Sequence, residues 1–384
     1  MGSSSNMSSR LLRQLYRVGR GLYQAVIPHD LRRKVWALRQ DSSGVANTNL
    51  TTGVQAPLPF DPVGAQAISG ASQAAAKLTT PPTQDVATHI AEILAPMVRN
   101  REHIQHFDFW QEHGFHVTQN HFYEPVPDTR DLKPEFWTTP SLLNGIDMND
   151  EEQLHLLRDV FPQFMDEYND IPFEETDDPT KYFTNNIMFG GTDSLVYYCL
   201  VRHFKPDTIL EVGSGFSTLI AAEAAVKNGG SAVTCIEPYP RDFLKKGFPG
   251  LKSLIPEKVQ DVDRSVFANL KPGDFLFIDT SHVVKMGSEV LYLYFEILPS
   301  IPEGVIVHIH DIFFPLEYPK SFVLTDRHFW NEQYLVQAFL MYNDSFKVLY
   351  GNSYMSHYHM QDVKNTFPNA NRWHGGSLWL RRSR

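Results

Sequence analysis

The chain of 384 residues contains only two cysteines, Cys199 and Cys235, and each lies within an apolar run. Two cysteines cannot form the disulfide framework of a small secreted domain, so we expect buried thiols in a reducing compartment. No uninterrupted apolar stretch reaches the roughly 20 residues that a membrane-spanning helix needs. The first residues also lack the apolar core of a signal peptide. A cytoplasmic location is therefore the simplest expectation.

Basic residues are scarce outside the N-terminal segment. Residues 1–40 contain eight Arg or Lys and one Asp, a net charge of +7, whereas the whole chain carries −10 and the remainder therefore −17. This acidic body disfavours nucleic acid as a partner. A hydrophobic content of 42%, with 12% aromatic residues, indicates a globular protein with a sizeable core.

Composition divides the chain into four parts. Within 10–39, arginines recur at helical intervals among leucines, which is typical of a basic amphipathic helix. Such a helix is expected to contact an anionic membrane peripherally or to bind a partner; a solvated tail is the alternative. After this basic tail (1–40), the uncharged, Ser-, Gly- and Pro-rich segment 41–83 predicts a flexible linker. We expect a helical and irregular lid region at 84–180 and an α/β domain at 181–384.

The segment that follows residue 207 has the order strand, glycine turn, helix, strand, acid. An apolar run at 208–212 leads into Gly213-Ser214-Gly215, where missing Cβ atoms allow the backbone to approach a ligand closely. A helical segment follows, and a second apolar run, 232–236, ends at Glu237. This order is that of a nucleotide-binding βαβ unit, in which the final acid binds ribose hydroxyls.

Two kinds of cofactor compete for such a unit. A dinucleotide site requires a third glycine or an alanine where this chain has Thr218, whereas an S-adenosylmethionine (SAM) site has an acid separated by one residue from the first glycine, as Glu211 is here. With this motif the chain resembles the class I SAM-dependent methyltransferases. The resemblance implies that SAM contacts Glu211, Gly213, Ser214, Gly215 and Glu237, with Gln260 and Asp261 at its adenine edge.

Apolar runs continue to alternate with helical segments towards the C-terminus. Strands are expected at 253–259, 274–278 and 304–309, with a long helix at 284–298. Two last strands at 346–350 and 377–381 have no clear helix between them. Right-handed crossovers then predict an α/β fold, a doubly wound Rossmann-like sheet of seven strands whose last strand is antiparallel, preceded by an N-terminal helical and irregular extension. A dehydrogenase is not expected to end in this way.

Polar side chains follow two strands that should be neighbours. Asp279-Thr280-Ser281-His282 follows one, and His310-Asp311 follows the other. Neighbouring strands are about 4.8 Å apart, and ligands in such sheets bind beyond the carboxyl ends of the strands, so these side chains should converge near the cofactor. Converging carboxylates repel unless a cation joins them, which predicts a divalent metal. Alternatively, Asp279 caps the next helix or positions the methionine part of the cofactor, and His308 is expected to be buried structure.

This pattern resembles the metal-assisted sugar O-methyltransferases, such as the macrocin and mycinamicin enzymes. The resemblance implies that Asp279, His310 and Asp311 bind the metal and that His282 is the catalytic base for a hydroxyl that the metal polarises. Those enzymes have two adjacent acids where this chain has His310-Asp311, so the metal is left open among Mg, Mn, Fe and Zn.

The expected function is therefore SAM-dependent O-methylation of a hydroxyl on a sugar or another small secondary metabolite. Two alternatives stay open at this stage. One is a metal-free methyltransferase that acts on nitrogen or another acceptor, and the other is a non-catalytic nucleotide-binding module. The sequence determines neither the acceptor nor whether the chain forms a homo-oligomer.

Overall fold

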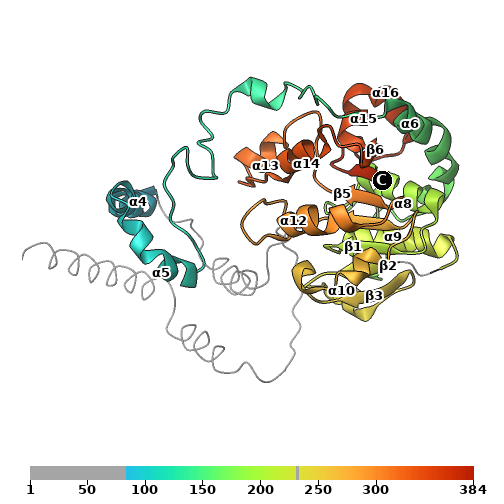
Figure 1. Ribbon diagram of the computed structural model, residues 1–384, viewed down its shortest axis with the longest axis horizontal. Helices are drawn as coiled ribbons and strands as arrows, with labels where there is room; N and C mark the ends of the chain where they lie inside the picture. Colours follow the sequence, from blue (N-terminus) through green and yellow to red (C-terminus); the bar gives the residue numbers. More distant parts are fainter. Residues whose placement is uncertain (1–83, 231–232) are drawn as a thin grey trace, which may run out of the picture. The chain divides into compact units, whose positions relative to one another are not determined.

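Seven short apolar runs form the strands of one sheet (Figure 1). The structure is a computed structural model that describes residues 84–230 and 233–384. The predicted basic tail and linker lie outside these residues. The strands are β1 Ile209–Val212, β2 Val233–Ile236, β3 Leu251–Ile255, β4 Phe275–Ile278, β5 Ile306–Ile309, β6 Phe346–Gly351 and β7 Leu378–Arg382.

The strand order is β3-β2-β1-β4-β5-β7-β6, and β7 is antiparallel to both of its neighbours. The other pairings are parallel. The predicted doubly wound, Rossmann-like sheet with an antiparallel last strand is thus confirmed. Because the strand order reverses between β1 and β4, the carboxyl ends of the central strands share the edge at which ligands bind in such folds.

Helical segments precede the sheet and connect its strands. Those before β1 are α4 Gln84–Arg99, η1 Glu102–His106, α5 Phe107–Glu112, η2 Pro134–Trp137, α6 Asp150–His155, η3 Leu156–Val160, η4 Phe161–Phe164, α7 Met165–Asn169 and α8 Thr192–Phe204. Those after β1 are α9 Phe216–Lys227, α10 Asp242–Lys246, η5 Val259–Asp261, α11 Ser265–Ala268, α12 Glu289–Tyr292, η6 Leu293–Ile297, η7 Leu298–Ser300, α13 Lys320–Leu324, α14 Glu332–Leu340, α15 Asn352–Tyr358 and α16 Met360–Thr366.

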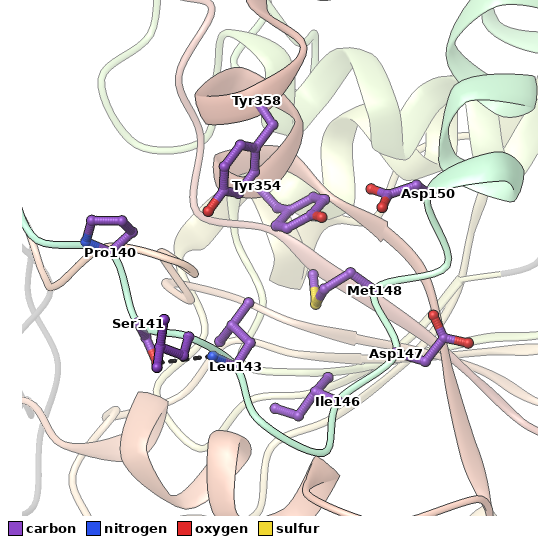
Figure 2. A pocket seen from close by; sticks show the side chains of 10 residues that line it. Pro140, Ser141, Leu143, Ile146, Asp147, Met148, Asp150, Tyr354 and Tyr358 are labelled. Carbon is purple, nitrogen blue, oxygen red and sulfur yellow. Dashed lines mark hydrogen bonds between the residues drawn. The ribbon is translucent and has the colours of Figure 1, made fainter.

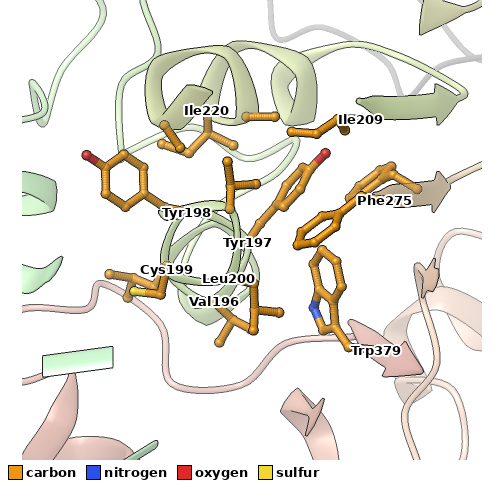
Figure 3. Close-up of a cluster of buried hydrophobic side chains, with 14 of the residues drawn as sticks. Val196, Tyr197, Tyr198, Cys199, Leu200, Ile209, Ile220, Phe275 and Trp379 are labelled. Atoms are coloured by element: carbon orange, nitrogen blue, oxygen red, sulfur yellow. The ribbon is translucent and has the colours of Figure 1, made fainter. Parts of the chain in front are cut away.

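The core has two halves, one on each face of the sheet, because successive strand residues point to opposite faces. On one face, Phe275 and Trp379 pack with side chains of α8 and α9 (Figure 3). On the other, Leu210 and Leu276 pack with residues of η6 and α14. Cys199 and Cys235 are buried free thiols in the first half, as predicted.

Three sequence-based predictions of local structure were wrong. Two helices, α15 and α16, separate β6 from β7; each is only seven residues long, too short for a clear helical period. The third strand ends at Ile255, before Pro256, which cannot donate to a strand ladder. The helix expected from residue 284 begins only at Glu289, where the Ser288 hydroxyl caps it by accepting from the amide of Leu291.

No helix among the described residues is long and apolar enough to cross a bilayer. All described residues belong to one compact unit. The division of this unit at residue 180 stays a prediction.

Candidate active site

The turn between β1 and α9 combines two glycines with different requirements. Gly213 has a φ of +81°, and a Cβ at this position would lie 1.7 Å from the carbonyl oxygen of Asp279. Gly215 has an extended φ of −177°, and a Cβ there would meet no atom within 4 Å. Backbone packing against the end of β4 therefore requires glycine at 213, whereas Gly215 faces open space of the kind that a ligand at this turn would occupy.

Glu211 lies beneath the turn, fully buried. Its Oε1 accepts from the Tyr197 hydroxyl at 3.0 Å and its Oε2 from the Thr218 hydroxyl at 2.5 Å. The same Thr218 oxygen accepts from the amide of Gly215 at 3.1 Å. Burial raises the pKa of Glu211 to about 8, although both hydroxyls hydrogen-bond its carboxylate. Both carboxylate oxygens thus face protein groups, and Glu211 supports the turn through Thr218.

Glu237 follows β2 and reaches back to the same turn. Its Oε2 accepts from the amide of Ser214 at 3.2 Å, and its Oε1 accepts from the amide of Tyr239 at 2.8 Å. Burial raises the pKa of this carboxyl. Each carboxylate oxygen has a second lone pair, so Glu237 retains the capacity to accept from a hydroxyl beside the turn.

Gln260 and Asp261 lie in η5, after β3. Gln260 is partly buried, and its Nε2 donates to the carbonyl of Gly287 at 3.3 Å. Asp261 is exposed. The Gln260 contact joins η5 to the loop after β4, so both residues lie at the sheet edge that carries the glycine turn.

The loops after β4 and β5 meet in an acid–imidazole cluster, which comprises Asp279, His282, Asp311 and Glu332. The two strands pair in register, with Ile278 opposite Ile309, and the segments that follow them therefore enter the same space. The Nε2 of His282 lies 3.3 Å from Oδ1 of Asp279 and 3.4 Å from Oδ2 of Asp311. Its Nδ1 lies 2.9 Å from Oε2 of Glu332.

Burial differs across this cluster. The side chains of His282 and Glu332 are 5% and 1% exposed, whereas those of Asp279 and Asp311 are 30% and 17% exposed. The two aspartates therefore form the side of the cluster that an acceptor molecule can reach.

Both ring nitrogens of His282 lie within 3.4 Å of carboxylate oxygens, an arrangement that favours the protonated, positively charged ring. Burial favours the neutral ring, but the bonds to Asp279 and Glu332 and the charge of Asp311 outweigh it and raise the pKa of His282 well above its usual value. Burial also raises the pKa of Asp311. For Asp279, burial acts in the same direction, but the adjacent His310 and His282 outweigh it and lower the pKa. Of the two accessible carboxylates, Asp311 is the better proton acceptor.

His310 lies beside the cluster without joining it closely. Its Nε2 is 3.9 Å from Oδ1 of Asp311, and its buried Nδ1 has no hydrogen-bond partner among the described residues. The ring packs against Phe189 at 5.1 Å. His308, two residues earlier and in β5, is fully buried, and its Nε2 lies 3.0 Å from the Ser377 hydroxyl.

The three predicted metal ligands lie near one another, but they do not form a ligand set as arranged. The imidazole of His282 stands between the carboxylates of Asp279 and Asp311. Over residues 84–230 and 233–384, no group of three or more His, Cys, Asp or Glu has an arrangement that could hold a metal ion. The residues present therefore do not fit a bound cation in this arrangement, and metal dependence stays a prediction.

Sequence reasoning missed Glu332, the most buried acid of the cluster. It is the first residue of α14, and its only sequence signal is an acid at a helix start, where acids are common on any helix. Its approach to His282 depends on the path of the connection between β5 and α14, which is mostly loop with the five-residue helix α13.

A pocket lies between the segment before α6 and helix α15 (Figure 2). Its lining includes Asp147, Asp150, Tyr354 and Tyr358, together with apolar side chains of the segment 140–148. The hydroxyl of Ser353, next to Tyr354, donates to the carbonyl of Phe313 at 2.8 Å. Part of the predicted lid region thus forms a pocket wall, and α15 contacts the loop that carries Asp311.

A family of known proteins matches part of the chain. Residues 210–312 match the model of a family described as a methyltransferase domain, and this match spans the glycine turn, Glu237 and the ends of β4 and β5. These residues are thus similar to a methyltransferase domain. The turn at 213–215 lies within the matched residues, at the carboxyl edge of the sheet.

Similar chains occur among curated proteins and solved structures. An uncharacterized protein of Archaeoglobus fulgidus is 36% identical over 160 residues, which cover 39% of this chain and 72% of that protein. A methyltransferase from Podospora anserina, solved with S-adenosylhomocysteine (SAH) bound, is 18% identical with a TM-score of 0.33, over 50% of this chain and 78% of that one. An O-methyltransferase from Bacillus cereus in complex with SAH is 13% identical with a TM-score of 0.31, over 62% and 98%.

Proposed function

We propose that this protein is a SAM-dependent methyltransferase that methylates a hydroxyl group on a small molecule, such as a sugar or another secondary metabolite. One observation carries the proposal: two partly exposed carboxylates, Asp279 and Asp311, meet at adjacent strand ends next to the glycine turn. Methyl transfer to an alcohol needs a proton acceptor within reach of the oxygen, because a neutral alcohol is a weak nucleophile. A carboxylate pair beside the cofactor turn supplies that acceptor.

The residues around the turn fit SAM. The amino-acid part of SAM would occupy the open space at Gly215, and its ribose hydroxyls would donate to the carboxylate of Glu237. Gln260 lies at the same edge of the sheet, where it would contact the adenine. When bound, SAM supplies a methyl group on a positively charged sulfur. Asp279 would favour that positive charge because its own pKa is lowered and it remains ionised.

In the proposed reaction, the acceptor hydroxyl loses its proton to Asp311 while its oxygen forms the bond to the methyl carbon. The bond between that carbon and sulfur breaks, and SAH leaves with the sulfur lone pair. The charged His282 holds the two aspartates in place throughout, because its Nε2 lies within ion-pair distance of both carboxylates. The sequence-based assignment of His282 as the base is less favoured by this arrangement, because an imidazolium has no lone pair to accept a proton.

Metal assistance is a separate part of the proposal, with Asp279, His310 and Asp311 as the ligands. It would require the ring of His282 to leave its position between the aspartates, and no step above depends on it. Assays with a chelator and with added Mg²⁺ or Mn²⁺ test this part. Turnover that falls with chelator and returns with metal supports metal assistance. Turnover that neither chelator nor metal changes contradicts it.

The function itself is tested by incubating the protein with methyl-labelled SAM and a panel of hydroxyl-bearing glycosides, with matched amines as controls. Label in an ether product of a glycoside is the expected result. Label that enters only amines would favour the N-methyltransferase alternative. Failure to bind SAM in calorimetry would favour a non-catalytic module.

A further inference from the structure

The start of helix α14 makes several contacts with the loop that carries His282. The amides of Asn331 and Glu332 both donate to the carbonyl of His282, each at 3.1 Å. In return, the amide of Val284 donates to Oδ1 of Asn331 at 2.6 Å. The ring of Trp330 packs against the ring of His282 at a centroid distance of 4.6 Å. The backbone and the ring of His282 are thus both held from one element.

His282 needs such support because its backbone is unfavourable. Its φ is +58°, in the left-handed region that non-glycine residues rarely adopt. A backbone of this kind persists only when surrounding contacts hold it, and it is found preferentially at functional sites. The contacts from residues 330–332 are of this stabilising kind.

The side chain of Glu332 completes the arrangement. Its Oε2 lies 2.9 Å from Nδ1 of His282, and both side chains are buried. The contact between Nδ1 and Glu332 orients the ring so that Nε2 points towards the two aspartates. A carboxylate on the far nitrogen fixes the orientation of a working histidine in this way in many enzymes.

We propose that Glu332 is a positioning residue for methyl transfer, which aims Nε2 of His282 at Asp279 and Asp311. This inference rests on the proposed function, since it assigns Glu332 to the same site. It predicts that the carboxylate acts through His282 alone and contacts neither cofactor nor acceptor.

The test compares three variants. Glu332→Ala removes the acceptor for Nδ1, Glu332→Gln keeps a neutral oxygen acceptor, and Glu317→Ala removes a nearby half-buried carboxylate that binds Gln333 and Tyr334 instead of His282. Misplacement of a reacting group by about 1 Å can lower a rate by about 100-fold. We expect kcat to fall about 100-fold in Glu332→Ala and much less in the other two, with the KM for SAM unchanged. Added formate should restore part of the loss in Glu332→Ala, because it can replace the missing carboxylate.

Nitrogen-15 NMR of the histidine rings gives a readout independent of turnover. We expect a slowly exchanging Nδ1 proton on His282, assigned with His282→Gln, that persists in Glu332→Gln and Glu317→Ala and is lost in Glu332→Ala. An Nδ1 proton unaffected by Glu332→Ala, or turnover of Glu332→Ala equal to that of Glu317→Ala, would overturn the inference. If the protein binds SAM but methylates no hydroxyl probe, the proposed function fails, and the NMR signal still decides the role of Glu332.

Discussion

His282 and Asp311 follow neighbouring strands, both have a left-handed backbone with φ near +57°, and their side chains meet at 3.4 Å. Left-handed residues other than glycine are uncommon, and two of them in contact at one sheet edge indicate that the local backbone is shaped for the contact. The contact brings an imidazolium to the carboxylate that we assign as proton acceptor.

Replacing His282 with Ala should lower turnover by about 100-fold or more and leave SAM affinity nearly unchanged. Turnover should fall because the imidazolium holds two carboxylates that would otherwise repel each other. SAM affinity should stay nearly unchanged because the ring lies on the acceptor side of the turn. Calorimetry with SAM and single-turnover assays measure the two quantities separately. Unchanged turnover would show that His282 has no role in methyl transfer. A parallel loss of SAM binding would show that it belongs to the cofactor pocket.

Asp311→Asn should abolish proton acceptance and leave the packing unchanged, because Asn has nearly the same size and shape as Asp. In the natural protein, turnover should fall as the pH drops through the pKa of Asp311, which burial raises, because the protonated acid cannot accept a second proton. The variant should lose most of its activity at every pH and no longer show that acidic limb. A pH–rate profile of both proteins measures this, and an acidic limb that persists in Asp311→Asn would assign proton acceptance to another group.

The two glycines of the turn provide a matched pair. Gly213→Ala should destabilise the fold by about 1–3 kcal/mol, because its Cβ would overlap the carbonyl oxygen of Asp279 and its φ is positive. Gly215→Ala should leave the melting temperature unchanged, because its Cβ meets no protein atom, and should weaken SAM binding. Thermal unfolding with and without SAM separates the two effects. Normal SAM affinity in Gly215→Ala would place the cofactor away from this turn.

Glu211 should make stability depend on pH. Its folded pKa of about 8 exceeds the usual value of 4.5, so the folded protein binds the proton more tightly than the unfolded chain does. The stabilisation is therefore complete below pH 4.5 and is lost as the pH rises through about 8, with a slope of at most about 1.4 kcal/mol per pH unit.

Denaturant unfolding from pH 5 to 9 measures this slope, and Glu211→Gln is the control because its side chain is neutral at every pH. The natural protein should lose stability relative to the variant as the pH rises. Parallel stability curves for the two proteins would show that Glu211 is ionised throughout.

Sequence patterns with a clear period or spacing predicted the sheet and its order. The glycine turn, the acid after β2 and the acids after β4 and β5 all belong to short motifs at strand ends, and the parallel register of β4 and β5 brings the loops of Asp279 and Asp311 to the same edge. Glu332 could not be predicted, because its approach to His282 depends on the path of the connection between β5 and α14, which contains only the short helix α13 between loops. The burial of Glu211 could not be predicted either. Its carboxylate accepts a hydrogen bond from Tyr197, which lies in a helix that precedes the motif.

A crystal structure of the complex with SAH tests the central claim most directly. We expect the amino-acid part of SAH at the turn 213–215, its ribose hydroxyls at Glu237 and its sulfur facing the carboxylates of Asp279 and Asp311. Binding at another edge of the sheet, or a sulfur that faces away from both aspartates, would contradict the account.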